Sequence, residues 1–285
     1  MVYEGILKAF QKVHAKGHIA LEDTKKSDFL FATSAPIVNP HNLKIAFYDV
    51  EGLYEEIPIN KADAVFTTEE NAILTFQKRF KCPVFHLPLG FDPETYKTEE
   101  TEPDVDITFC GTLFDPRPKV LSWLDAVSDN YKIRIITPSS WRSRLLNKGK
   151  IDIIADSEWV PLEETIDYYL RSKIILCINR AEENKNTKLK NRTPGRSFGE
   201  AALNRCVFID DSRDISKFFQ PRDEIITYSL DHHGSDLRAC LQFYLEEFEE
   251  FREEVAQAGT LRALKEHTWD HRVAILVSKL HKIIH

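Results

Sequence analysis

The chain has 285 residues, of which 42% are hydrophobic and 29% are charged. This is the composition of a soluble globular protein that is long enough for two α/β domains of ordinary size. The formal net charge of −7 argues against a wholly basic nucleic-acid binder. A membrane span is excluded because the sequence contains no run of about 18 apolar residues.

Cysteine usage and the first residues predict the compartment. The N-terminal residues lack a basic-then-apolar leader, which argues against secretion. The five cysteines are scattered and form no Cys-x-x-Cys pair. We therefore expect a reduced, cytoplasmic protein without a cysteine-based metal site.

The first part of the chain alternates strands with helices. Apolar residues at three- and four-residue spacing predict a helix from Tyr3 to Val13. An amphipathic helix is predicted over 68–80. Strands are predicted at 28–33, 43–48, 62–67 and 83–88. Such alternation is typical of parallel β-α-β units. Prolines, a glycine and an acidic run then predict a linker over 88–103.

A second α/β series follows the linker. Strands are predicted at 106–111, 132–137, 151–155, 173–178, 206–210 and 224–228. Helices are predicted at 119–127, 162–171, 236–256 and 268–284, with a further one beginning near Glu200. The sequence therefore predicts two Rossmann-like domains, residues 1–100 and 101–285. The first is expected to be incomplete, because it opens with a helix and lacks the Gly-x-Gly-x-x-Gly turn of dinucleotide enzymes.

The loop from Gly111 to Lys119 is the first candidate for ligand binding. Glycine lets the backbone approach a ligand, and a helix N-terminus beside Arg117 or Lys119 favours an anion such as a diphosphate. The alternative is an ordinary strand-to-helix loop with solvated cations.

Glu200 is the most informative single residue. It stands at the start of an Ala-rich helix that leads into the strand at 206–210. A carboxylate accepts two hydrogen bonds from a vicinal diol such as that of ribose. The alternative is a carboxylate that only complements the helix dipole, a contribution of about 0.3–1 kcal/mol.

The polar loop over 179–196 gathers cations after the strand at 173–178. Its positive residues include Lys185, Lys188, Lys190, Arg192 and Arg196. Ligands of open parallel sheets bind outside the carboxyl ends of the strands. These cations are expected to hold a donor diphosphate or an anionic acceptor, and a solvated loop without a role is the alternative.

Asp49 and Glu51 follow the strand at 43–48, at a carboxyl end of the first domain. Either carboxylate is a candidate general base for an acceptor hydroxyl. Loop carboxylates without a role are the alternative. No metal site is predicted, because Asp104-Val-Asp106 lies in the acidic linker and the pair His267 and His271 lacks the glutamate of a zincin motif.

Four segments in this order resemble a known family. They are Gly111 to Arg117, Glu158 to Asn179, Arg196 to Ala202 and Glu266 to Arg272. Together with residues 62–68 and 86–92, they resemble the CgeB-like (spore-maturation-type) glycosyltransferases, which are similar to the group 1 GT-B enzymes. The resemblance runs from about residue 40 to the end.

The resemblance implies a GT-B-like α/β fold, in which two Rossmann-like domains face a cleft and the final helix crosses back to the first domain. It implies a donor-binding second domain, with Glu200 on the ribose, Arg117 or Arg196 on the diphosphate, and the backbone of Trp159 and Val160 on the base. The other donor-binding residues it implies are Gly111, Lys119, Asn179, Lys190, Ser197 and Phe198. The implied donor is a UDP-linked sugar such as UDP-glucose. Hexosyl transfer would then need no metal and no other cofactor, because cationic groups offset the leaving-group charge.

Two hypotheses for the function follow. In the first, the protein transfers a sugar from a nucleotide-diphosphate sugar to a hydroxyl of a glycan, a protein or a hydroxylated DNA base. In the second, it is a non-catalytic module that holds a nucleotide or glycan. The incomplete first domain favours the second hypothesis. So does Arg192, which stands where group 1 enzymes often carry a glutamate. The sequence specifies neither the donor sugar nor the oligomeric state.

Overall fold

The structure, a computed structural model, describes residues 2–15, 29–33, 44–50, 59, 61–98, 100–180, 197–230 and 232–284. These residues fall into two compact units. The first contains Met1–Asp92 and Glu266–His285, and the second contains Pro93–Lys190 and Arg196–Lys265. Both are built on parallel sheets, which confirms the α/β prediction.

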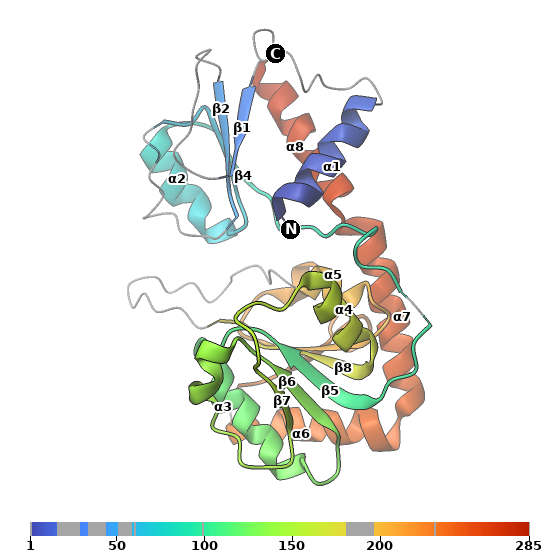
Figure 1. Cartoon of the computed structure of the whole chain (residues 1–285). Helices are drawn as coiled ribbons and strands as arrows, with labels where there is room; N and C mark the ends of the chain where they lie inside the picture. Colours follow the sequence, from blue (N-terminus) through green and yellow to red (C-terminus); the bar gives the residue numbers. More distant parts are fainter. Residues whose placement is uncertain are drawn as a thin grey trace. The chain divides into compact units, whose positions relative to one another are not determined.

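The first unit is a four-stranded parallel sheet with helices on both faces (Figure 1). Its strands, in the order β1-β2-β3-β4, are β1 (Phe29–Ala32), β2 (Lys44–Asp49), β3 (Ala64–Thr67) and β4 (Val84–His86). Helices α1 (Val2–Ala15) and α8 (Trp269–Ile284) pack on the face that contains Tyr48 and Phe66. The predicted helix over 68–80 is instead a 3-10 turn, Glu70–Ala72, followed by α2 (Ile73–Phe80). The Thr67 hydroxyl accepts the Glu69 N–H at 3.1 Å ahead of that turn.

The second unit is a six-stranded parallel sheet in the order β10-β9-β8-β5-β6-β7. The strands are β5 (Val105–Cys110), β6 (Ile133–Ile136), β7 (Asp152–Ile154), β8 (Ser172–Cys177), β9 (Cys206–Asp210) and β10 (Ile226–Tyr228). The chain runs outward from β5 to β7, then returns to add β8 on the other side of β5. The strand order therefore reverses between β5 and β8. In open α/β sheets, ligands bind at the carboxyl ends of the strands at such a reversal.

Helices cover both faces of this sheet (Figure 1). Successive side chains of a strand point to opposite faces, so each face packs against its own helices. The helices of the unit are α3 (Arg117–Ser122, extended by a 3-10 turn to Val127), α4 (Leu162–Leu170), α5 (Ser197–Ala201), α6 (Ser235–Gln242) and α7 (Glu249–Glu266). Ile107, Ile174 and Phe208 share a buried cluster with α3, α6 and α7. Helices α4 and α5 contact β8 and β9 respectively. Burial of this many aliphatic side chains is the main stabilising contribution, at roughly 25 cal/mol per Å² of apolar surface.

The prediction of a single helix over 236–256 is wrong. Helix α6 ends at Gln242, and Phe243–Glu247 form a π turn in which the Phe248 N–H donates to the Phe243 carbonyl at 2.9 Å. Phe248 has φ −139° and ψ 64°, and α7 begins at the next residue. None of the described helices is long and apolar enough to cross a membrane.

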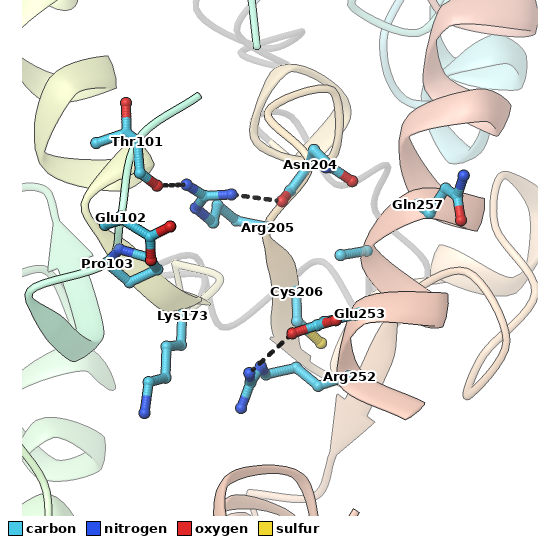
Figure 2. Close-up of a pocket in the computed structure, with 11 residues that line it drawn as sticks. Thr101, Glu102, Pro103, Lys173, Asn204, Arg205, Cys206, Arg252, Glu253 and Gln257 are labelled. Atoms are coloured by element: carbon cyan, nitrogen blue, oxygen red, sulfur yellow. Dashed lines mark hydrogen bonds and ion pairs between the residues drawn. The ribbon is translucent and has the colours of Figure 1, made fainter. Parts of the chain in front are cut away.

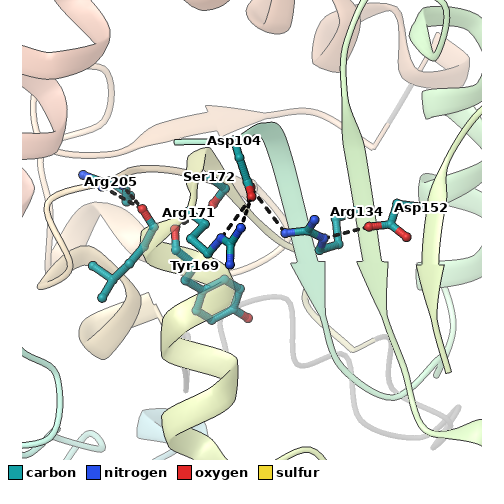
Figure 3. Close-up of polar contacts among 8 residues, drawn as sticks. Asp104, Arg134, Asp152, Tyr169, Arg171, Ser172 and Arg205 are labelled. Atoms are coloured by element: carbon teal, nitrogen blue, oxygen red, sulfur yellow. Dashed lines mark hydrogen bonds and ion pairs between the residues drawn. The ribbon is translucent and has the colours of Figure 1, made fainter. Parts of the chain in front are cut away.

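An ion-pair network ties together the strands at the amino-terminal edge of this sheet (Figure 3). Arg171, after α4, pairs with Asp104, and Arg134 on β6 lies between Asp104 at 3.6 Å and Asp152 at 2.9 Å. The hydrogen bond from Arg171 holds the pKa of Asp104 below its usual range. Asp106 accepts the Lys132 N–H at 2.9 Å. The Asp-x-Asp motif therefore lies at the edge opposite to the carboxyl ends of the strands, where it joins neighbouring strands.

Candidate functional site

The loop after β5 is joined to the end of β8 by Arg117. Its Nε donates to the Ile178 carbonyl at 2.9 Å, and its Nη1 donates to the Thr112 carbonyl at 2.7 Å. The Gly111 N–H donates to the Ile136 carbonyl at the end of β6 at 2.9 Å. Arg117 thus fixes the two strand ends at the reversal of strand order. Its predicted role as a diphosphate ligand stays a prediction. Lys119, in the first turn of α3, is exposed.

Asp210 fixes the neighbouring loop, where β8 and β9 end. The residue is fully buried, and its Oδ2 accepts the Asn179 N–H at 2.5 Å. Its other carboxylate oxygen accepts the Ser212 N–H at 3.1 Å and the Ser212 hydroxyl. The amide of Asn179 donates back to the Asp210 carbonyl at 3.3 Å. Asn179, a predicted donor-binding residue, therefore has a fixed backbone and a fixed side chain.

A series of stacked cationic and aromatic side chains, which the sequence pattern does not predict, crosses this edge. The Arg180 guanidinium lies 4.0 Å from the ring centroid of Phe114, in the loop after β5. Phe114 packs edge-on against Trp141 with centroids 4.7 Å apart, and Arg144 lies over Trp141 at 5.4 Å. Cation–π contacts contribute about 0.5–1 kcal/mol at exposed sites, enough to favour one position of a long side chain. Arg180 directly follows Asn179, so its place after β8 was the available signal.

Glu200 lies inside the unit, in the last turn before β9. All five residues of α5 are buried, and Glu200 is 1% exposed. Phe198 anchors the helix between Phe218 and Phe219, with ring centroids 5.3 and 6.0 Å away. Gly199 is required by space, because a Cβ there would lie 2.5 Å from the Tyr96 ring. The buried Ser197 hydroxyl oxygen has no hydrogen-bond partner among the described residues.

This placement matters because a buried carboxylate is costly unless polar groups compensate it. A carboxylate that only complements the helix dipole would serve equally well on the surface, where it keeps its water and has no desolvation cost. Burial of Glu200 together with Ser197 is typical of a functional site. The predicted ribose-binding role of Glu200 stays a prediction.

The loop after β7 presents Trp159. Glu158 accepts the Ser140 N–H at 2.7 Å and the Ser140 hydroxyl at 2.6 Å, and it also accepts the Ser139 hydroxyl. The Ser139 hydrogen bond, followed by that of Ser140, lowers the pKa of Glu158. These contacts tie the loops after β6 and β7 together, and they leave the Trp159 side chain 70% exposed. Val160 follows, half-buried.

Comparison with known proteins identifies the family. The model of the family described as Glycosyl transferase-like matches residues 117–278. This chain belongs to that family. Spore protein CgeB of Bacillus subtilis (strain 168) is 27% identical over 229 residues, which cover 76% of this chain and 68% of CgeB. The resemblance to CgeB-like glycosyltransferases is thereby confirmed.

Solved structures confirm the GT-B-like fold of this glycosyltransferase. Sucrose-phosphate synthase from Thermosynechococcus elongatus matches with a TM-score of 0.63 at 12% identity, covering 99% of this chain and 78% of that one. Anabaena Alr3699/HepE in complex with UDP-glucose matches with a TM-score of 0.61 at 9% identity, covering 96% and 82%. A glycosyltransferase from Rickettsia africae ESF-5 matches with a TM-score of 0.60 at 11% identity, covering 99% and 81%.

In the first unit of the glycosyltransferase, Asp49 ends β2 and is 4% exposed. Its Oδ2 accepts the Thr67 hydroxyl at 3.3 Å, and its carbonyl accepts the Thr68 N–H at 3.2 Å. The carboxylate thus joins β2 to β3, and its role as general base stays a prediction. Glu51, Lys190 and Arg196 lie outside the described residues, and their predicted roles stay predictions as well.

The Glu266–Arg272 motif of the glycosyltransferase family joins α8 to the loop after β4. Buried Arg272 donates to the carbonyls of Leu89 at 3.1 Å and Glu266 at 3.0 Å, and its Nη2 lies 3.0 Å from His267 Nδ1. The Trp269 N–H donates to the Phe91 carbonyl at 2.9 Å. We refer to these contacts as the α8 clasp. They show a structural use for one of the four segments that resemble the family.

A cavity of about 470 Å³ lies in the second unit, where β5, β8 and β9 begin (Figure 2). Its cations are engaged by the protein itself. Arg205 donates to the Leu170 carbonyl at 2.7 Å and the Thr101 carbonyl at 2.6 Å, Arg252 pairs with Glu249 at 3.2 Å, and Lys173 pairs with Asp106 at 2.9 Å. The cavity lies at the amino-terminal edge, so it does not coincide with the predicted donor-binding residues at the carboxyl edge.

Proposed function

We propose that this protein transfers a hexose from a UDP-linked donor to a hydroxyl acceptor, with the donor held at the carboxyl edge of the second unit. The observation that carries the proposal is the burial of Glu200 in α5, in the unit whose strand ends Arg117 and Asp210 fix. The ribose diol would donate two hydrogen bonds to the Glu200 carboxylate. UDP is proposed because HepE, a structural neighbour, was solved in complex with UDP-glucose.

The diphosphate is assigned to the cations nearest the reversal of strand order. Arg117 donates to two backbone carbonyls, and the guanidinium of Arg180, just after β8, lies over the Phe114 ring in the loop that precedes α3. We assign the main phosphate contact to Arg180, with Lys119 beside the α3 N-terminus as a second cation. These groups would offset the charge of the leaving nucleoside diphosphate without a metal ion. The loop backbone at Trp159 and Val160 would hold the base.

The first test is a titration of the purified protein with nucleotide sugars and free nucleotides, followed by thermal unfolding. Ligand at ~100 times its dissociation constant stabilises a fold by about 2.7 kcal/mol. We expect stabilisation by UDP and by one UDP-sugar, and none by the other nucleoside diphosphates. If none of these compounds raises the unfolding temperature, the donor assignment is contradicted.

A second test concerns Arg180. Replacing Arg180 with Met removes a charge-assisted phosphate contact, so we expect the dissociation constant of UDP to rise about tenfold, or ~1.4 kcal/mol. Calorimetric titration measures this. The matched control is Arg144→Met at the other end of the same stack, where the guanidinium pairs with Asp115 at 2.8 Å. Equal losses in both variants would point to disruption of the stack instead of a phosphate contact.

The acceptor is proposed from chemistry, as a hydroxyl on a glycan, a protein or a hydroxylated DNA base, with Asp49 or Glu51 as general base. The DNA option rests on the cations of the loop over 179–196. Phosphate contacts make DNA affinity fall steeply with salt. Salt-independent retention of DNA, or no retention at all, would remove that option.

The free thiols of all five cysteines support the proposal that the protein works in the reducing cytoplasm.

A non-catalytic binding module is the second candidate. It would bind UDP or a glycan at the same residues without transfer. Release of free sugar from the UDP-sugar found in the titration, even by slow hydrolysis, distinguishes the two. Binding with no turnover would favour the module.

A further inference from the structure

The surface between α6 and α7 carries three exposed phenylalanines that contact one another. Phe243, Phe248 and Phe251 are 37%, 42% and 52% exposed. The ring centroids of Phe243 and Phe248 are 4.5 Å apart, and those of Phe248 and Phe251 are 5.7 Å apart. We call these residues the aromatic patch. Scattered exposed apolar residues are normal, whereas a contiguous group on a rigid surface marks an interaction site.

Contacts with the interior of the second unit hold the aromatic patch in place. Phe243 packs against Tyr244 at 4.9 Å, and Tyr244 packs edge-on against Phe208 of β9, which is fully buried, at 5.7 Å. The π turn brings Phe243 and Phe248 together, because the Phe248 N–H bonds to the Phe243 carbonyl. Such turns are rare in helices and are frequent at functional sites. A rigid aromatic surface loses little conformational entropy when a partner binds.

Acidic residues flank the phenylalanines of the aromatic patch in the sequence, and we call them the acidic rim. Residues 243–254 contain six glutamates and one arginine, which gives this segment a formal charge of −5 (one positive minus six negative). The arginine, Arg252, is buried and pairs with Glu249 at 3.2 Å and Glu253 at 3.6 Å. Glu250 and Glu254, one turn apart on α7, form no ion pair within the part of the chain that the structure describes. Like-charge repulsion disfavours nucleic acids and anionic membranes here.

We propose that the aromatic patch and its acidic rim dock a cationic amphipathic helix of a partner protein. Apolar side chains at i, i+3, i+4 and i+7 of that helix would cover the phenylalanines, and its lysines or arginines would face Glu250 and Glu254. The residues of this surface come from the π turn, Phe248 and the start of α7. The proposal is therefore independent of the donor site and of the proposed transfer reaction.

The test uses the full chain and a fluorescein-labelled helical peptide of about 18 residues, with leucine on one face and lysine on the other. Fluorescence anisotropy at roughly 150 mM salt measures binding. We expect saturable binding that weakens at least about tenfold in the Phe248→Ser/Phe251→Ser variant. Leu261→Ser is the matched control, because Leu261 is 63% exposed on the same helix and lies outside the aromatic patch.

A charge exchange tests the rim separately and does not depend on the phenylalanine variants. The Glu250→Lys/Glu254→Lys variant should lose the lysine peptide and gain affinity for the same peptide with glutamate in place of lysine. Equal binding by the wild type and the Phe248→Ser/Phe251→Ser variant would overturn the proposal. Binding of both peptides by the wild type would also overturn it. Sedimentation showing a wild-type dimer and a monomeric phenylalanine variant would assign the patch to a second copy of the chain instead.

Discussion

Replacing Glu200 with Gln is expected to weaken binding of the donor nucleotide by ~1.5–3 kcal/mol, or roughly 10- to 150-fold. The side chain keeps its shape, so the buried site around it, 1% exposed, stays filled. What is lost is the negative charge that two ribose hydroxyls would share, and hydrogen bonds to charged groups contribute about 1.5–3 kcal/mol. Calorimetric titration with the nucleotide identified by thermal unfolding measures the loss.

Glu164→Gln is the matched control for this substitution. Glu164 is also a hydrogen-bonded carboxylate of the second unit, but it is exposed on α4, where it accepts the Tyr168 hydroxyl at 3.0 Å. We expect its removal to leave nucleotide affinity within about twofold. Unchanged affinity in Glu200→Gln, in a protein that unfolds at the wild-type temperature, would disprove the ribose assignment.

Replacing Arg272 with Met is expected to destabilise the first unit by about 2–4 kcal/mol. Burial lowers the pKa of Arg272 to about 10, so the charge itself is costly there. The substitution nevertheless leaves the partly buried carbonyls of Leu89 and Glu266 without this donor, and each such loss costs about 1–3 kcal/mol. The cost of the unpaired acceptors should exceed the gain from removing the charge.

The loss of stability in the first unit can be followed separately by tryptophan fluorescence of the full chain. Of the four tryptophans, Trp123, Trp141 and Trp159 lie in the second unit and Trp269 lies in the first. A background with the first three changed to Phe would leave Trp269 as the reporter of urea unfolding. Lys12→Met removes an ion pair to Asp270 whose side chains are 46% and 49% exposed, and it should cost about 0–1 kcal/mol. Equal stability of the two variants would contradict the role assigned to the α8 clasp.

Secondary structure was predicted best where local pattern determines it. The strand at 206–210 has the predicted bounds, because a run of β-branched, aromatic and buried residues has few other uses in a parallel sheet. The break at Phe248 was not predicted, because no glycine or proline marks it. It coincides with the packing of Tyr244 against Phe208, a contact between residues thirty-six positions apart (244 minus 208).

Site residues were harder to predict, because residue type does not reveal what a side chain contacts. Arg117 has the charge and the position of a phosphate ligand, yet its guanidinium bonds to backbone carbonyls. Asp49 has the sequence context of a loop carboxylate and is instead buried between strands. Arg180 was passed over because its partner, Phe114, is sixty-six residues away (180 minus 114).

The pairing of α1 with α8 has a consequence for synthesis of the chain. The core of the first unit includes Ile6 and Ala9 together with Trp269, Val273 and Leu276, and Trp269 fills the space above Gly5. That core is incomplete until α8 has left the ribosome. The described parts of the second unit lie between α1 and α8 in the sequence, so the second unit can fold while α8 is still being synthesised. Of these two units, the one that contains α1 is therefore completed later than the one that follows it in the sequence.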